Sequence, residues 1–191
     1  KFNDEITIIN NDILEVVENK ISNKKLTVFG NLPYNISTEI LSKWIMNLGK
    51  NFWFENLVLM FQKEVADRII SEFNTSKYGR LSILTNWKLH AKKIIDIKPT
   101  SFFPKPKIDS SLLLLTPKEN FFKLENSKNL EMITRIFFSQ RRKMIKKPFN
   151  KVFKNAKEIA EKFSIDLNLR PQNLDPETYF KLAREFENLR S

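Results

Sequence analysis

The residues best suited to chemistry lie in one short stretch, Val28-Phe29-Gly30-Asn31-Leu32-Pro33-Tyr34-Asn35-Ile36-Ser37. The apolar run at 26–29 predicts a buried strand that ends at Gly30, and Ser37 begins a predicted helix. Pro33 fixes its own φ and lacks an N–H, so the residues in between form a stiff loop. That loop follows the carboxyl end of a strand, which is the edge where open α/β sheets bind ligands.

The tetrapeptide Asn31-Leu32-Pro33-Tyr34 offers one amide side chain, backbone carbonyls and one aromatic ring. The amino group of a nucleobase is a poor nucleophile, because its lone pair is delocalised into the ring. The Asn31 side-chain oxygen and the Leu32 or Pro33 carbonyl could accept its two N–H bonds, while Tyr34 stacks on the base. An ordinary strand-to-helix turn would have the same composition, and four residues alone do not separate these two interpretations.

Two further residues could serve such a site. Phe102 lies in the Pro-rich segment 99–107 and could supply a second stacking wall, or it could be a core residue. Asp12 follows a short apolar run and could accept a hydrogen bond from the adenine or ribose of a cofactor. Asp12 could equally be a solvated loop or N-cap residue. We interpret His90, Glu64 and Asp67 as structural or solvated.

A basic stretch lies further along the chain. Nine Lys and Arg residues occur between 135 and 157, and no Asp or Glu lies between Met132 and Lys157. Apolar residues alternate with these cations, so one side would be buried while the charges face out. A solvated helix face is the alternative, but self-repulsion without counter-charges favours a polyanionic partner. The predicted RNA-binding residues are Arg135, Arg141, Arg142, Lys143, Lys146 and Lys147.

The amino-acid composition narrows the class of partner and excludes several kinds of site. The chain has 191 residues, of which 33 are basic and 22 acidic, so its net charge of +11 favours nucleic acid or an anionic membrane surface as partner. The alternative explanation of the net charge is a composition that is rich in Lys throughout, without a polyanionic partner. The absence of Cys excludes disulfides, thiol nucleophiles and Cys-ligated zinc, and a single His leaves no metal site to predict. No apolar run is long enough to predict a transmembrane helix.

The periodicity predicts an α/β layer followed by helices. Strands are expected at 6–9, 26–29, 56–61, 93–97 and 110–116, and helices near 13–17, 37–48, 63–73 and 81–87. This alternation predicts a largely parallel sheet. After Pro117 only helices are expected, at about 128–138, 154–163 and 176–188. We therefore expect two domains, 1–118 and 119–191.

Four motifs then follow one another in order. They are the Asn31–Ser37 stretch, Phe61-Gln62-Lys63-Glu64-Val65-Ala66, Tyr78-Gly79-Arg80-Leu81-Ser82 and Phe102-Phe103-Pro104-Lys105-Pro106-Lys107-Ile108-Asp109-Ser110. With them the chain resembles the family of ribosomal RNA small-subunit adenine N6,N6-dimethyltransferases. Arg141-Arg142-Lys143 and Leu169-Arg170-Pro171 resemble that family's helical C-terminal domain.

The resemblance implies an N-terminally truncated, Rossmann-like class I methyltransferase sheet. It implies transfer of methyl groups from S-adenosylmethionine to N6 of two adjacent adenines in small-subunit (16S) rRNA. Asn31 and Leu32 would hold N6, with Pro33 completing the motif. Tyr34 and Phe102 would sandwich the base, and Asp12 with Asn31 would contact the cofactor.

One departure from the family matters. Only Gly30, Gly49 and Gly79 are present, so the glycine-rich cofactor loop is missing, as is the acidic residue for the cofactor's ribose. We therefore expect weak or no binding of S-adenosylmethionine by this chain. Because the two strands beside the 6–9 strand would also be missing, residues 1–20 are expected to be rearranged, disordered or paired with a partner chain.

The resemblance also sets the expected partners and the alternatives. We expect small-subunit rRNA in the immature 30S subunit as partner, no membrane, and a cytoplasmic location. A monomer is expected for a full-length protein and a strand-swapped dimer is open to this fragment. The alternatives are a large-subunit rRNA adenine methyltransferase and a non-catalytic RNA-binding or ribosome-assembly protein.

Overall fold

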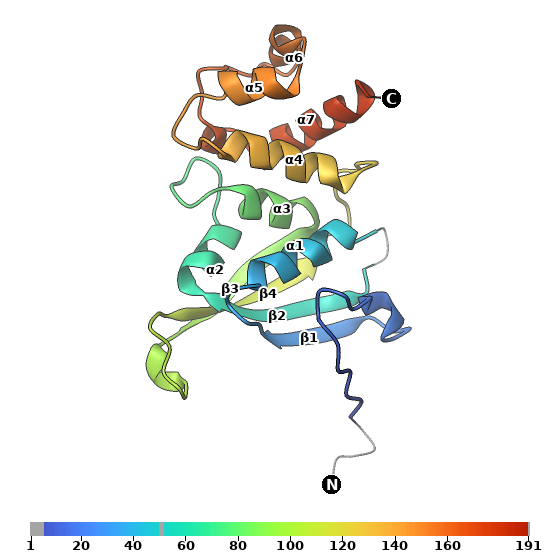
Figure 1. Cartoon of the computed structure of the whole chain (residues 1–191), viewed down its shortest axis with the longest axis vertical. Coiled ribbons are helices and arrows are strands. Elements are labelled where there is room, and N and C mark those ends of the chain that lie inside the picture. Colours follow the sequence, from blue (N-terminus) through green and yellow to red (C-terminus); the bar gives the residue numbers. More distant parts are fainter. Residues whose placement is uncertain (1–5, 50–51, 191) are drawn as a thin grey trace.

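The computed structural model describes residues 6–49 and 52–190, and its centre is a four-stranded sheet with helices on one face (Figure 1). The strands are β1 (Leu26–Asn31), β2 (Phe54–Gln62), β3 (Leu89–Ile97) and β4 (Ser110–Pro117). The helices are α1 (Ser37–Asn47), α2 (Lys63–Ile69), α3 (Arg80–Lys88), α4 (Ser127–Phe138), α5 (Lys146–Val152), α6 (Ala156–Lys162) and α7 (Pro176–Asn188). Three 3₁₀ turns complete the elements: η1 (Glu18–Lys20), η2 (Pro99–Ser101) and η3 (Pro171–Asn173).

The sheet has the order β1-β2-β4-β3, and its pairing corrects one expectation. β1 pairs with β2 in parallel, but β4 pairs antiparallel with both β2 and β3. The prediction of a largely parallel sheet was therefore wrong for these strands. The physical reason lies in the connections, because only the loop at 98–109 with its short η2 turn joins β3 to β4. Without a crossover helix, the chain returns antiparallel beside its predecessor.

Helices α1, α2 and α3 lie against one face of the sheet, and α4 to α7 stack beyond α3 (Figure 1). The inward side chains of α1, among them Ile40, Leu41 and Ile45, recur at helical spacing and are fully buried. The core continues without a break from the sheet through α3 into α4 and α7. This continuity fixes the C-terminal helices to the sheet layer.

The N-terminal segment departs from the predicted elements. Residues 6–9 form no strand, and Ile6, Ile8 and Ile9 are each more than half exposed. The expected helix at 13–17 is replaced by turns that lead into η1. The missing strand has a physical cause, since a lone strand without a neighbour cannot satisfy its backbone groups. Both corrections agree with the expected rearrangement of this region, of which residues 1–5 lie outside the described part.

The C-terminal helices agree with the sequence except in one place. Helices α4, α6 and α7 lie where the pattern put them. Asp175 caps α7 by accepting a hydrogen bond from the Thr178 N–H at 2.8 Å. Helix α5 was not among the predicted helices. Pro148 is the third residue of that helix, where a missing N–H breaks no helical hydrogen bond. Among the described helices, none is long and apolar enough to cross a membrane.

A buried lysine joins α3 to the end of α1. The Lys88 Nζ donates hydrogen bonds to the carbonyls of Ile45 (3.1 Å) and Leu48 (2.6 Å), and it lies 3.9 Å from the ring centroid of Trp87. It thereby satisfies carbonyls at the end of a helix that has no basic residue in its own last turn. Burial lowers the pKa of Lys88 to about 8.

The lowered pKa of Lys88 predicts that the free energy of unfolding rises at alkaline pH. Between about pH 8 and the unfolded pKa of about 10.4, the unfolded chain retains a proton that folded Lys88 has lost. The free energy of unfolding should therefore rise with pH in this window, by on the order of 2 kcal/mol. Urea unfolding at several pH values should show this rise in the wild type. Lys88→Met should reduce it, with a remainder from Lys118, whose pKa burial also lowers. Substitution of the exposed Lys25 by Met should leave the rise in place, and an unchanged rise in Lys88→Met would contradict the assignment.

Candidate functional site

The loop after β1 is fixed at both of its ends. Asn31 ends β1 in register with Met60 of β2, and its side chain is exposed. At Gly30 a Cβ would lie 2.7 Å from the Leu59 Cδ2, so glycine permits the close approach of β1 to the core there. The Ile36 N–H donates to the Pro33 carbonyl at 3.1 Å, which closes a turn. The loop therefore presents the Asn31 amide from a rigid backbone.

The start of α1 is also bonded back to the loop. The sequence offered Ser37 or Thr38 as a helix cap, but Ile36 occupies the cap position and Ser37 is the first helical residue. The Ser37 Oγ donates to the Tyr34 carbonyl at 3.2 Å. The hydroxyl thus fixes the backbone at Tyr34 instead of capping the helix.

Tyr34 makes the long-range contact that defines the site. Its hydroxyl lies 2.6 Å from the Ser110 Oγ, across 76 residues of sequence. Ser110 is fully buried and pairs with Gln62 of β2 and with Ile97 of β3, so its position is set by three strands. A buried hydroxyl needs a partner, and Tyr34 supplies one. Sequence reasoning missed this role of Ser110, because no local pattern signals a contact over that separation.

The loop at 98–109 brings Phe102 to the same edge of the sheet. It leaves the carboxyl end of β3 and enters β4 at Ser110, beside the Tyr34 hydroxyl. Phe102 is half-buried, whereas Phe103 is fully exposed. Among the contacts of the described residues, none joins the Phe102 ring to Tyr34. The structure therefore places the predicted second wall on the right loop, and the sandwich itself stays a prediction.

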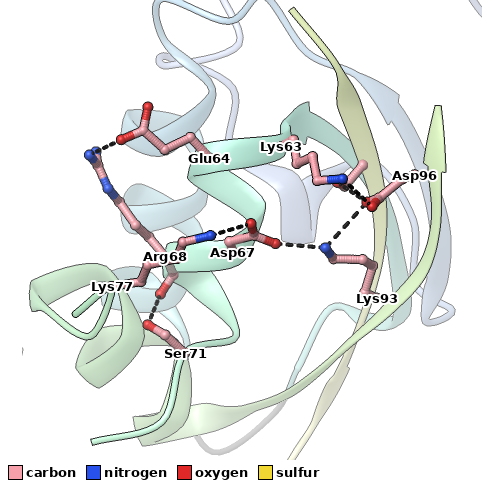
Figure 2. A network of polar contacts seen from close by, with 9 residues as sticks. Lys63, Glu64, Asp67, Arg68, Ser71, Lys77, Lys93 and Asp96 are labelled. Atoms are coloured by element: carbon pink, nitrogen blue, oxygen red, sulfur yellow. Dashed lines mark hydrogen bonds and ion pairs between the residues drawn. The ribbon is translucent and has the colours of Figure 1, made fainter. Parts of the chain in front are cut away.

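An ion-pair network lies next to Ser110, at the edge of the sheet that carries the Tyr34 loop (Figure 2). The Asp96 carboxylate of β3 accepts hydrogen bonds from Lys63 (2.6 Å) and Ser111 (2.6 Å), and Lys93 lies 3.2 Å away. These partners, Lys63 first, hold the pKa of Asp96 well below its usual range. Asp67 joins the network through Lys93, at 2.6 Å. The network ties the first turn of α2 to β3 and β4 next to Ser110.

The two predicted structural carboxylates behave as expected. Glu64 pairs with Arg68 one helical turn away, and Asp67 accepts from Lys77 and Lys93 at 2.6 Å each. Burial alone would raise the pKa of Asp67, but the two lysines outweigh burial and lower it. His90 is exposed. In the part of the chain that the structure describes, no group of three or more acidic or histidine side chains could hold a metal ion.

Asp12 lies away from the loop after β1. One carboxylate oxygen of Asp12 accepts from the Leu14 N–H at 2.9 Å, so the side chain closes a local turn. The neighbouring carbonyls of Ile13 and Val16 accept from Lys43 Nζ of α1, at 3.0 and 2.6 Å. The segment is therefore docked on the side of α1. No described hydrogen bond joins it to Asn31 or Tyr34.

The predicted RNA-binding residues lie in α4 (Arg135), in the loop that joins α4 to α5 (Arg141, Arg142 and Lys143) and in α5 (Lys146 and Lys147). Five of them are exposed, namely Arg135, Arg142, Lys143, Lys146 and Lys147. The sixth, Arg141, is half-buried and donates to the carbonyls of Thr75 and Ser76. Of the interleaved apolar residues, Phe137, Ile145, Phe149 and Phe153 are buried as predicted, Phe138 is half-buried, and Met144 is 54% exposed. Lys143, Lys146 and Lys147 surround an open hollow that Met144 also lines.

The site therefore combines an exposed amide, a fixed aromatic ring and a distant cationic surface. A family model described as ribosomal RNA adenine dimethylase matches residues 1–188. The chain belongs to the ribosomal RNA adenine dimethylase family. Members of this family transfer methyl groups from S-adenosylmethionine to adenines of rRNA.

Individual relatives agree with this family. The ribosomal RNA small subunit methyltransferase A of Pelagibacter ubique is 77% identical over 190 residues, which cover 100% of this chain and 72% of that protein. A crystal structure of a dimethyladenosine transferase from Plasmodium falciparum has 28% identity and a TM-score of 0.73, over 94% of this chain and 72% of that one. The 23S rRNA methyltransferase ErmE, at 19% identity and a TM-score of 0.60 over 96% and 71%, shows the shared fold alone.

The family's cofactor does not fit the described residues as a complete site. One carboxylate oxygen of Asp12 is engaged by its own turn, and the carbonyls of Ile13 and Val16 hold this segment on α1, whereas Asn31 lies at the end of β1. The three glycines of the chain are far apart in sequence, at 30, 49 and 79, so none forms a glycine-rich loop. The described residues therefore offer one exposed amide and one aromatic ring at the loop after β1, and no glycine-rich loop beside them.

Removal of the hydrogen bond between Tyr34 and Ser110 should release the Tyr34 ring selectively. Ser110→Ala should destabilise the fold by about 1 kcal/mol, because one buried hydrogen bond is lost. It should also free the ring of Tyr34, one of only three tyrosines, and this change is visible in NMR spectra of tyrosine-labelled protein. Ser111→Ala is the matched control, since Ser111 is equally buried but bonds to Asp96. It should cost similar stability and leave the Tyr34 signals in place. Equal changes in both variants would contradict the assignment.

Proposed function

We propose that this chain carries the base-binding side of an rRNA adenine N6,N6-dimethyltransferase acting on two adjacent adenines of small-subunit rRNA. The observation that carries the proposal is the rigid Asn31–Tyr34 loop at the carboxyl end of β1, with the Tyr34 hydroxyl bonded to Ser110. Membership of the dimethylase family supports it. The catalytic residues are Asn31, Leu32, Pro33, Tyr34 and Phe102.

The loop can hold the amino group of a flipped adenine. The Asn31 oxygen accepts one N–H bond, and a backbone carbonyl accepts the other, so the lone pair is withdrawn from the ring and turns toward the electrophile. Because the Pro33 carbonyl already accepts from the Ile36 N–H at 3.1 Å, the Leu32 carbonyl is the better second acceptor. Tyr34 stacks on one face of the base, and Phe102 approaches from the 98–109 loop.

The helical part docks the rRNA in this proposal. Residues 1–118 form the partial methyltransferase domain, and 119–191 form the RNA-binding domain with Arg135, Arg141, Arg142, Lys143, Lys146 and Lys147. Exposed cations bind the phosphate backbone, so the affinity should fall steeply with salt. The physiological partner would be the immature 30S subunit, and the place of action the cytoplasm.

The oligomeric state depends on the free edge of β1. In the described sheet β1 has a neighbour only on the side of β2, and Phe29 on this edge strand is 78% exposed. Unpaired strand edges accept strands from other chains. A strand-swapped dimer therefore remains open to this chain, and a monomer is proposed for the full-length protein.

Two alternatives remain testable. The shared fold with ErmE keeps a large-subunit rRNA methyltransferase as a candidate. The incomplete cofactor site favours a non-catalytic RNA-binding or ribosome-assembly protein for the chain as given. Methylation assays with a full-length version on small-subunit precursors and on large-subunit RNA separate these functions. A signal only with large-subunit RNA would overturn our choice, and RNA binding without any methylation would favour the assembly protein.

Asn31 provides the sharpest test of the mechanism. In a full-length version, Asn31→Ala should lower the methylation rate by about 10² to 10³, because a positioned acceptor for the amino group is lost. RNA affinity should stay nearly unchanged. Asn35→Ala is the matched control, since Asn35 is an exposed amide on the same loop, and it should retain activity. Parallel loss of RNA binding and turnover in Asn31→Ala would refute the role of Asn31.

Cofactor binding provides a separate test. We predict that the present chain binds S-adenosylmethionine weakly or not at all, because it has no glycine-rich loop. Isothermal titration calorimetry measures this directly, and S-adenosylhomocysteine is a useful second ligand. Binding as tight as that of a full-length relative would contradict the prediction.

A further inference from the structure

A second cationic site lies between the base-binding loop and the basic segment. It is a cavity of about 390 Å³ where α1, α3 and the end of α4 meet. Four cations line it, namely Arg68, Lys77, Arg80 and Arg141, together with the hydroxyl residues Thr38, Ser42 and Ser82. No carboxylate lines the cavity. A concave site with four cations and no acid favours an anion.

The carboxylates that pair with these cations lie outside the cavity lining. Figure 2 shows that Arg68 pairs with Glu64 and Lys77 with Asp67, and the Arg80 Nη2 lies 3.7 Å from the Glu131 carboxylate. Asp67 is also shared with Lys93, so its charge does not fully neutralise Lys77. The acids therefore hold the cationic side chains in place without closing the cavity to an anion. Such preorganisation reduces the ordering cost of binding.

Two of the arginines, Arg141 and Arg80, have a charge or a donor that an anion could use. Arg141 donates to the carbonyls of Thr75 and Ser76, which are neutral acceptors and leave its positive charge uncompensated. The Arg80 Nε is buried, and no hydrogen-bond partner for it is found among the described residues. A buried donor without a partner is costly, and an anion in the cavity would offer an acceptor.

The cavity lies between the start of α1 and the basic run that follows α4. Thr38, which lines it, is the second residue of α1, and the preceding Ser37 is bonded to the Tyr34 carbonyl. At the other end, Arg141 begins the run Arg141-Arg142-Lys143 of the predicted RNA surface. The cavity thus joins the loop that would hold the base to the surface that would hold the backbone.

We propose that this cavity binds a backbone phosphodiester of the RNA strand next to the flipped adenine. The inference rests on the proposed function and specifies where the substrate backbone enters the site. Two oxygens of one phosphate would accept from Arg80 and Arg141, while Arg68 and Lys77 supply further charge. Binding here would fix the distance between the flipped base and the basic segment.

A pair of matched lysines tests the proposal. Lys77 and Lys181 are both ion-paired and about half exposed, but only Lys77 lines the cavity. The affinity of the chain for an RNA stem-loop with two adjacent loop adenines is measured over a range of salt concentrations. Lys77→Gln and Arg80→Gln should each weaken binding several-fold and lower the salt slope by about one. Lys181→Gln should change neither quantity. Equal behaviour of Lys77→Gln and Lys181→Gln would overturn the proposal.

Two additional measurements identify the ligand and separate the hypotheses. Inorganic phosphate, titrated into the chain, should compete only weakly with the stem-loop. If it binds in the cavity while Lys77→Gln leaves RNA affinity unchanged, the cavity is a free-phosphate site and the proposal is wrong. If RNA binding depends on Lys77 and Arg80 but a full-length version methylates no adenine, the proposed function fails while the phosphodiester site is supported.

Discussion

The insertion of β4 between β2 and β3 is the constraint on which the site depends. Because β4 pairs with both neighbours, Ser110 and Ser111 at its start are held by backbone bonds on two sides and are fully buried. Each then uses its hydroxyl to fix a different group, Tyr34 for Ser110 and Asp96 for Ser111. Two adjacent residues thereby connect the loop after β1 with the ion pairs around α2. The site is consequently built from segments that the chain order keeps far apart.

The charged groups near the site serve first as supports. Asp67 and Asp96 each accept hydrogen bonds from lysines on more than one element, and these contacts hold the pKa values of both carboxyls below their usual range. Such exposed pairs contribute little stability one by one. As a network they orient the cationic side chains of α2, β3 and the following loop. With a net charge of +11 there remain many cations without an acidic partner for a polyanion to contact.

Much of the fold could be predicted from local sequence patterns, and each wrong or missing prediction has an identifiable physical cause. The strand at 26–29 and the helix from Ser37 were predictable because their apolar residues repeat with one clear period. Residues 6–9 carry an equally good strand pattern, but without a neighbouring strand that pattern has no backbone partner. Helix α5 was not among the predicted helices, although Pro148 lies in its first turn, where a proline is tolerated. The motif gave Asn31 and Tyr34 as candidate site residues, which stay a prediction, whereas the contact of Ser110 with Tyr34 could not be found, because it depends on the sheet order.

The N-terminal segment and the loop after β1 are held by separate sets of contacts. The segment from Asp12 to Glu18 is bonded to α1 through Lys43 and Trp44, and the Trp44 Nε1 donates to Glu18 at 2.6 Å. The base-binding loop is bonded to β4 and to the first turn of α1 instead. No described hydrogen bond connects these two groups of contacts. The geometry of the loop after β1 therefore depends on β4 and on the first turn of α1, and among the described hydrogen bonds on none from the segment at 12–18.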